Sequence, residues 1–279
     1  MSYKSISTLL CDAKQDLHIL DAAIALARQH DAHLDIICLG LDRTQPGFYY
    51  SGANAIILQD KMNLAQDESQ AIETAVLAHM EPQDIRWSTR PMVAQMAGLA
   101  VQIAQVMRFS DLVILPRPYG KGREIEHERI IEAALFSARR PVLVMPANAA
   151  LPASLNTAVT AWNESTEALN AIRAALPMLQ DAKQVDITII DPPKHGPDRS
   201  DPGGALCQML ARHSVDVEVS VLAKTMPRVA DVLMRHVQDK SADILVMGAY
   251  GHSRLRESIL GGATRHILEN VEIPVFMAH

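Results

Sequence analysis

Short apolar runs alternate with longer amphipathic stretches along the whole chain. Residues 33–39, 112–115 and 184–190 are rich in aliphatic and β-branched side chains and are too short for helices, which is typical of buried strands. Residues 17–30 and 166–179 carry apolar side chains at helical spacing. This alternation predicts an α/β fold with a mainly parallel sheet and helices on both of its faces.

The same pattern occurs twice. In each half an aspartate, Asp111 or Asp243, opens a short apolar run, and a proline, Pro141 or Pro274, opens another. The aspartate and the proline are 30 residues apart in the first half and 31 apart in the second. The repeat predicts two tandem doubly wound domains, each with a mainly parallel five-stranded sheet.

The domains are expected over residues 1–147 and 155–279, because the segment 146–155 between them holds two prolines and no periodicity. Within them, weaker patterns mark the remaining elements. Further strands are expected over 5–11, 84–88, 157–162 and 215–222, helices near 92–109 and 229–240, and loops over 40–55 and 191–204.

Composition and charge narrow the possible functions. Aromatic residues are only 4% of the chain, so the cores must be aliphatic. The formal net charge of −6 argues against nucleic acid or an anionic membrane as the main partner. No apolar run is long enough for a membrane span, and the first residues do not resemble a signal peptide. These features favour a cytoplasmic protein without a membrane partner.

Cysteine and histidine spacing indicates neither a metal site nor a catalytic group. The three cysteines are scattered, and the eleven histidines lack the paired spacing of metal ligands. There is no GxSxG motif for a nucleophilic serine. We therefore expect no catalytic residue and no metal ligand.

A glycine-bearing loop after the expected strand 243–247 is the strongest chemical signal. Its last glycines open a helix, where backbone N–H groups lack intrahelical partners and the helix dipole favours negative charge. Glycine also lets phosphate oxygens approach the main chain. The residues expected to hold phosphate are Gly248, Gly251, His252, Arg254, Gly261, Gly262, Ala263 and Thr264. The competing interpretation is that the glycines serve tight turns and close helix–strand packing.

This segment resembles the universal stress protein family, whose ATP-binding members carry Gly-x2-Gly-x9-Gly-[Ser/Thr] here. Gly248, Gly251 and Gly261 match the full spacing, whereas Gly262 stands where the pattern has Ser or Thr. The resemblance covers the chain as two copies and is strongest over 243–277. It implies the Rossmann-like fold of adenine nucleotide alpha hydrolases and binding of ATP, with or without Mg²⁺. It also implies an internal pseudo-dimer of the two domains and a possible homodimer.

The resemblance also suggests where adenine would lie. Family members often hold the base with an aspartate that ends the first strand, and Asp12 stands there in the first copy. The second copy has Trp162 followed by Asn163 instead. Trp162 could stack on a base or belong to the core, and the backbone at Ile189 would meet adenine by analogy.

The first copy of the loop is degenerate. Pro116 replaces the first glycine, Gly120 and Gly122 are out of register, and residues 128–131 replace the Gly-Gly-Ala-Thr sequence with Glu-Arg-Ile-Ile. An acidic side chain and bulky β-branched residues at a helix N-terminus would repel phosphate and block its approach. Nucleotide binding by this motif is therefore expected only in the second domain.

Four functions remain open. The leading hypothesis is a stress-response protein that binds ATP or another adenine nucleotide and acts by binding. The alternatives are a tandem scaffold that binds no nucleotide, a slow ATPase, and a protein that binds a different ligand in the same cleft with residues 191–204 as a lid. The absence of a P-loop lysine and of an obvious metal-holding acid argues against rapid phosphoryl transfer.

Overall fold

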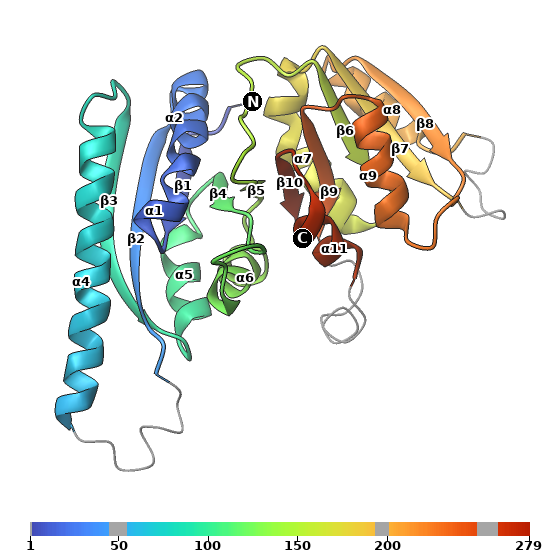
Figure 1. The fold of residues 1–279 in the computed structure, drawn as a ribbon. Helices are drawn as coiled ribbons and strands as arrows, with labels where there is room; N and C mark the ends of the chain where they lie inside the picture. Colours follow the sequence, from blue (N-terminus) through green and yellow to red (C-terminus); the bar gives the residue numbers. More distant parts are fainter. Residues whose placement is uncertain (1, 45–54, 193–200, 250–261) are drawn as a thin grey trace. The chain divides into compact units, whose positions relative to one another are not determined.

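The computed structural model describes residues 2–44, 55–192, 201–249 and 262–279. The chain divides into two compact units, Ser2–Val142 and Leu143–His279. Strands and helices alternate along both units (Figure 1), and the strand pairs described below are all parallel. The predicted α/β class with a mainly parallel sheet is confirmed.

The first unit places its strands in the order β3-β2-β1-β4. These strands are β1 (Ser5–Leu10), β2 (His33–Asp42), β3 (Arg86–Gln95) and β4 (Leu112–Pro116). Its helices are α1 (Ala13–Asp16), α2 (His18–His30), α4 (Ala55–Met80), α5 (Leu99–Met107) and α6 (Ile125–Glu132), which continues into a π-helical segment, Ala133–Ser137. The strand β5 (Val142–Met145) begins where this unit ends.

The second unit repeats this arrangement with the strand order β10-β9-β6-β7-β8. Its strands are β6 (Thr157–Ala161), β7 (Gln184–Ile190), β8 (Val217–Leu222), β9 (Ile244–Gly248) and β10 (Val275–Ala278). Its helices are α7 (Thr166–Asp181), α8 (Gly204–Arg212), α9 (Val229–Asp239) and α11 (Ala263–Asn270). The first strand lies inside the sheet in both units, so the chain order reverses beside it.

The two aspartates that mark the sequence repeat have the same structural role. The Asp111 carboxylate accepts hydrogen bonds from the backbone N–H groups of Lys4 and Ser5, at 2.7 and 3.0 Å. The Asp243 carboxylate accepts them from Asn156 and Thr157, at 2.5 and 3.1 Å. In each unit the aspartate therefore ties the start of the fourth strand to the start of the first, which is why an acidic residue opens this apolar run in both halves.

The predicted loop over 40–55 and the predicted helix from residue 92 are wrong at their edges. β2 and β3 pair over ten residues, from His33 opposite Arg86 to Asp42 opposite Gln95. This long ladder supplies backbone partners that outweigh local helical preference. Gly40 lies within β2, where an added Cβ would come 1.7 Å from the Ala65 carbonyl oxygen of α4. Gly40 therefore does not form a turn, and its missing side chain lets α4 pack closely against β2.

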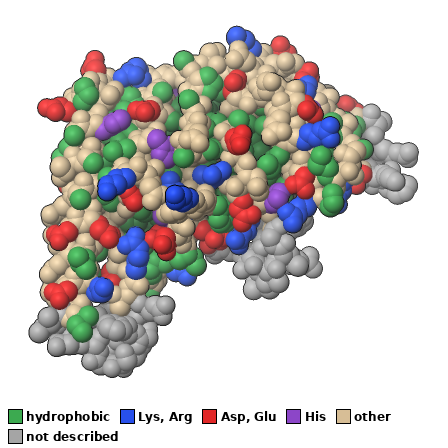
Figure 2. Space-filling model, viewed as in Figure 1, with side chains coloured by type: hydrophobic (Ala, Val, Ile, Leu, Met, Phe, Trp, Pro, Cys, Tyr) green, Lys and Arg blue, Asp and Glu red, His purple; other side chains and the backbone are tan. Residues whose placement is uncertain are grey.

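Charged side chains of both signs are interspersed on the face of the molecule that Figure 2 shows. Among the described residues on that face, no basic patch of the kind that binds nucleic acid is visible. Over the described part of the chain, no helix is both long and apolar enough to cross a membrane.

Candidate functional site

A pocket of about 480 Å³ lies at the carboxyl ends of β6 and β9 in the second unit. These strands are neighbours between which the chain order reverses, the usual ligand site of open parallel sheets. Its lining residues, from strand ends and helix starts, are Ala161, Trp162, Asn163, Ser165, Glu167, Thr188, Ile190, Val229, Ala230, Leu233, Met247, Gly248, Ala263, Thr264 and Ile267. The volume falls in the range of small-molecule sites, about 300–1,000 Å³.

Three helices direct their N-termini to this pocket. Ser165, the N-cap of α7, lines it and accepts a hydrogen bond from the Ala168 N–H at 3.1 Å. Val229 begins α9, and Ala263 begins α11, and both line the pocket. Each helix N-terminus carries a partial positive charge, so the three dipoles together favour an anion in the pocket.

The N-terminus of α11 lies at the pocket, and among the described residues no side chain caps it. Its N-cap is Gly262, with φ −57° and ψ 166°, and no side chain caps the first turn. The first amides of an α-helix have no intrahelical carbonyl partner. Ala263 and the buried Thr264 of this turn both line the pocket. The first turn is thus built from small side chains around a group of backbone N–H donors.

A charged chain of hydrogen bonds joins α9 to α11 beside the pocket. Arg228, the N-cap residue of α9, donates from Nη1 to His266 Nδ1 at 2.9 Å. Because a guanidinium has no acceptor, Nδ1 must accept, and the hydrogen of His266 is on Nε2. Nε2 donates to the Asp231 carboxylate at 2.6 Å. The Arg228 guanidinium and the Asp231 carboxylate balance each other in this network, which ties α9 to α11 beside Val229, a residue that lines the pocket.

The structure brings together most of the predicted site residues that it describes. Trp162, Gly248, Ala263 and Thr264 line one pocket, and Gly262 caps the adjoining helix. The predicted Ile189 is buried and does not line it, because its strand neighbours Thr188 and Ile190 do. The other predicted positions, Gly251, His252, Arg254 and Gly261, lie outside the described residues.

Residues of α7 and α9 were missed by the sequence analysis. Glu167, Val229 and Leu233 line the pocket although no motif marks them. Their position along the chain could have indicated them, because each helix that follows a parallel strand begins at the carboxyl edge of the sheet, where ligands bind. Ser165 was detectable as the N-cap of the expected helix over 166–179.

The equivalent place in the first unit is filled by paired side chains. Arg123 Nη1 lies 2.5 Å from Asp16 Oδ1, and the two side chains are 8% and 0% exposed. Arg43 donates to the buried Glu126 at 2.9 Å. The cavity found there has a volume of about 10 Å³, far less than a nucleotide needs. The charged side chains therefore neutralise each other at this end of the sheet.

The helix of this degenerate copy begins earlier than predicted. α6 starts at Ile125 with Glu124 as its N-cap, and the Glu124 and His127 groups form a capping box. The prediction that residues 128–131 stand at a helix N-terminus is therefore wrong, because they lie within the helix. Glu124 nevertheless places an acidic side chain at the N-terminus of α6. The expected repulsion of phosphate would therefore come from Glu124 and not from Glu128.

Two titratable groups beside this capping box are perturbed. Burial raises the pKa of the Cys11 thiol well above its ordinary value, and the negative charges of Asp16 and Glu126 raise it further. Burial lowers the pKa of His127, and the nearby charge of Arg123 lowers it further. At neutral pH the Cys11 thiol and the His127 imidazole are therefore both uncharged.

The comparisons with known proteins agree with this fold and match one part of the chain to a family. Residues 154–279 match the model of the universal stress protein family. A universal stress protein from Synechocystis sp. is 32% identical over 72 residues, which are 26% of this chain and 24% of that protein. The chain thus matches about a quarter of that relative's length.

Several solved structures align with nearly the whole chain. A universal stress protein from Archaeoglobus fulgidus DSM 4304 aligns with a TM-score of 0.74 and 13% identity, covering 98% of this chain and 95% of that one. A protein of unknown function from Pseudomonas aeruginosa PAO1 aligns with a TM-score of 0.57 and 13% identity, covering 99% and 92%. At this identity the likeness shows the fold, and the sequence match adds the family: residues 154–279 of this chain form a universal stress protein domain.

Proposed function

We propose that this chain is a cytoplasmic stress-response protein that binds ATP or another adenine nucleotide in its second unit and acts by binding rather than by fast catalysis. The observation that carries the proposal is the pocket of about 480 Å³ on which the N-termini of α7, α9 and α11 converge. An anionic, partly apolar ligand suits such a site, because helix dipoles favour the charge and aliphatic side chains accept the remainder.

The order of the strands suggests how a nucleotide would lie. β7 and β9 flank β6, so the pocket extends from Thr188 and Ile190 past Trp162 to the mouth of α11. We place the phosphates at the α11 mouth, where Ala263 and Thr264 present their amides. The base then lies toward β7, with the face of Trp162 available for stacking, and the ribose lies between them.

Binding is favoured over hydrolysis by the charges in the pocket. Among the lining residues that the structure describes, Glu167 is the one ionisable side chain. Rapid phosphoryl transfer requires groups that hold a metal, stabilise developing charge and orient the attacking water. A single carboxylate supplies at most one of these functions. Where Mg²⁺ accompanies the phosphates, Glu167 is the carboxylate placed to contact it.

One observation favours the alternative of a scaffold without nucleotide. A Cβ added to Gly248 would come 2.6 Å from the Ala168 backbone nitrogen. Close packing of β9 against the start of α7 therefore explains this glycine without any ligand. The test of nucleotide binding must use another position, and the N-cap Gly262 is suitable because its φ of −57° is accessible to every residue.

Equilibrium dialysis of ATP against wild-type, Gly262→Asp and Gly262→Ser chains tests the proposal. Aspartate is a favourable N-cap, so Gly262→Asp keeps the helix while its carboxylate occupies the first amides and repels phosphate. We expect ATP affinity to fall at least about tenfold in Gly262→Asp without loss of thermal stability. Serine supplies a neutral hydroxyl donor worth about 1 kcal/mol, so Gly262→Ser should bind ATP up to about fivefold more tightly.

The outcomes separate the candidate functions. No ATP binding by the folded wild-type chain at millimolar concentration favours the scaffold. Equal affinity in the aspartate and serine variants contradicts a phosphate site at α11. Phosphate release that Gly262→Asp abolishes would favour the slow ATPase. The predicted internal pseudo-dimer and the possible homodimer stay predictions, which analytical ultracentrifugation with and without ATP would examine.

A further inference from the structure

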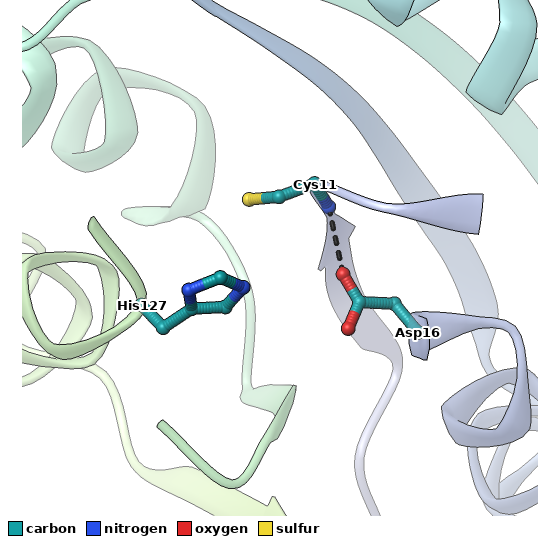
Figure 3. A group of neighbouring side chains, drawn as sticks. All are labelled: Cys11, Asp16 and His127. Carbon is teal, nitrogen blue, oxygen red and sulfur yellow. Dashed lines mark hydrogen bonds between the residues drawn. The ribbon is translucent and has the colours of Figure 1, made fainter. Parts of the chain in front are cut away.

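Three side chains of the kinds that bind transition metals converge in the first unit (Figure 3). The ligand atoms of Cys11, Asp16 and His127, one sulfur, one carboxylate oxygen and one ring nitrogen, all lie within 4.8 Å of one another. Cys11 follows β1, Asp16 ends α1 and His127 lies in the first turn of α6. Among the described residues, no other three His, Cys, Asp or Glu side chains form such a group.

The space between these side chains suits one small occupant. The cavity of about 10 Å³ is lined by the three polar residues and by Leu9, Leu115, Pro116, Ile130 and Ile131. A cavity of about this size holds one water molecule, so it can hold one ion and excludes an organic ligand. Its aliphatic walls lower the local dielectric and strengthen the attraction between a cation and its ligands.

The histidine is oriented by its backbone neighbours. His127 Nδ1 lies 3.2 Å from the Glu124 carbonyl oxygen and 3.1 Å from the Glu124 N–H. Because these contacts occupy Nδ1, Nε2 is the nitrogen left for a metal. Without a metal, Nδ1 accepts from the Glu124 N–H, and the ring hydrogen is on Nε2. When a metal binds Nε2, the ring hydrogen is on Nδ1, which then donates to the Glu124 carbonyl oxygen, the usual outer contact of a histidine ligand.

The carboxylate is held as firmly. The backbone N–H groups of Cys11 and Asp12 donate to Asp16 Oδ2 at 2.9 and 3.1 Å. Arg123 contacts the other oxygen, Oδ1, at 2.5 Å. The orientation of Asp16 is therefore set without a metal. The guanidinium also adds a positive charge near the cavity, which weakens the affinity for a cation without removing the ligand.

We propose that the first unit binds one Zn²⁺ ion through Cys11 Sγ, His127 Nε2 and a carboxylate oxygen of Asp16. Zn²⁺ takes thiolate, imidazole and carboxylate ligands in a tetrahedron, with a water molecule in a fourth position. Adjacent ligand atoms in such a site are about 3.5 Å apart, so the side chains close by about 1 Å on binding. Cys11 binds as the thiolate, and its proton is released to solvent.

This site would lie at the same end of the sheet as the pocket of the second unit, but it would bind a cation instead of an anion. At the strand crossover the second unit presents helix N-termini and small residues to an anion. The first unit presents Cys11 and His127 there, with Glu124 at the mouth of α6, and these groups suit a cation. A bound Zn²⁺ would tie the end of β1 to the start of α6 and so stabilise the first unit.

Cobalt substitution in the full-length chain tests the proposal. The reduced protein is treated with a chelator, exchanged into metal-free buffer and titrated with Co²⁺ as the spectroscopic probe. We expect one equivalent to give a thiolate-to-cobalt charge-transfer band with the visible bands of a tetrahedral site, and Zn²⁺ to displace them. Cys11→Ser should abolish the charge-transfer band, and His127→Gln should abolish the tetrahedral bands. Cys207→Ser, which changes a half-buried cysteine of the other unit, should leave both.

A second measurement uses the wild-type chain alone, so it tests the proposal even if a variant fails to fold. In the wild-type chain, iodoacetamide reaches Cys11 only when the first unit opens. Zn²⁺ should slow this alkylation at least about tenfold, measured by peptide mapping, because an ion that binds the folded unit makes such openings rarer. Cys207 is the internal control, and its rate should not change. A folded wild-type chain without a charge-transfer band, a band that Cys207→Ser removes, or Cys11 alkylation that Zn²⁺ does not slow would each overturn the proposal.

Discussion

The His236 imidazole on α9 donates a hydrogen bond of 3.1 Å from Nε2 to the fully buried carboxylate of Asp186 on β7. The same carboxylate accepts hydrogen bonds from Thr188 and Ser220 and lies 3.0 Å from the Lys240 ammonium group. A buried charge of this kind is tolerated because every neighbour compensates it. The network therefore fastens α9, one wall of the proposed nucleotide pocket, to the sheet.

Replacing Asp186 by asparagine should destabilise the second unit. Asp186→Asn removes the partner of Lys240 and His236, and loss of one member of a buried pair costs about 3 kcal/mol. Asp35 stands at the same position of β2 in the first unit, but its side chain is 43% exposed. Asp35→Asn is thus a matched control and should cost less than about 1 kcal/mol. Urea unfolding followed by tryptophan fluorescence measures both, and equal losses would contradict the assigned role.

The same carboxylate predicts a dependence of stability on pH. Burial raises the pKa of Asp186, but hydrogen bonds from Ser220, Thr188, Lys240 and His236 outweigh it and lower the pKa to about 2. Since this pKa is lower in the folded state, the contribution is complete above about pH 4 and is lost as pH falls through about 2.

The expected size of the effect is about 2 kcal/mol, from a shift of nearly two pKa units. Unfolding of wild-type and Asp186→Asn chains between pH 2 and pH 5 measures it. The difference in the free energy of unfolding between the two should shrink toward the acid end of this range. A constant difference would show that Asp186 acts through packing alone.

The sequence was sufficient for the fold class because the repeated elements are specified locally. The run 184–190, rich in valine and isoleucine, forms a strand with the predicted bounds, since such side chains favour a strand that is buried on both faces. The repeated Asp111 and Asp243 could be recognised as a pair, although their hydrogen bonds to the first strand could not. The pocket residues Trp162, Gly248, Ala263 and Thr264 were predictable because strand ends and helix starts meet at one edge of the sheet.

What the sequence could not predict depends on contacts between distant residues. β3 continues to Gln95 because it pairs with β2, and no local pattern encodes that partner. Cys11 and His127 are far apart along the chain, so no ligand spacing indicates that the fold brings them together. The helix α6 begins at Ile125 because Glu124 and His127 cap it. Matching residues 128–131 to the Gly-Gly-Ala-Thr sequence of the second copy placed the helix start too late and so missed this pair.

Gly248 provides a test of packing at the pocket that is separate from ligand binding. In Gly248→Ala, the new Cβ would lie 2.6 Å from the Ala168 nitrogen and 2.8 Å from the Glu167 carbonyl carbon. Because both are backbone atoms, α7 must shift, which should cost about 1–3 kcal/mol. Thermal unfolding without nucleotide measures the loss. Gly98→Ala is a control, since the nearest atom to its added Cβ lies at 3.9 Å. Unchanged stability in Gly248→Ala would remove the packing explanation for this glycine.

The two tryptophans allow the orientation of the nucleotide to be tested. Trp162 lines the pocket of the second unit, whereas Trp87 lies on β3 of the first. An adenine base stacked on the Trp162 ring should quench its fluorescence, because the two aromatic faces are in contact. ATP should therefore quench the Trp87→Phe variant, in which Trp162 is the one tryptophan, and leave the Trp162→Phe variant unchanged.

The position of the base can be separated from phosphate binding by the choice of ligand. Inorganic triphosphate carries the charge without a base, so it should compete with ATP and release the quenching of Trp162. If triphosphate itself quenches Trp162 as strongly as ATP does, the signal reports a change at the helix N-termini rather than stacking. If ATP binds by dialysis but quenches neither variant, the base does not contact Trp162, and the proposed orientation across β6 is wrong while the phosphate site at α11 stands.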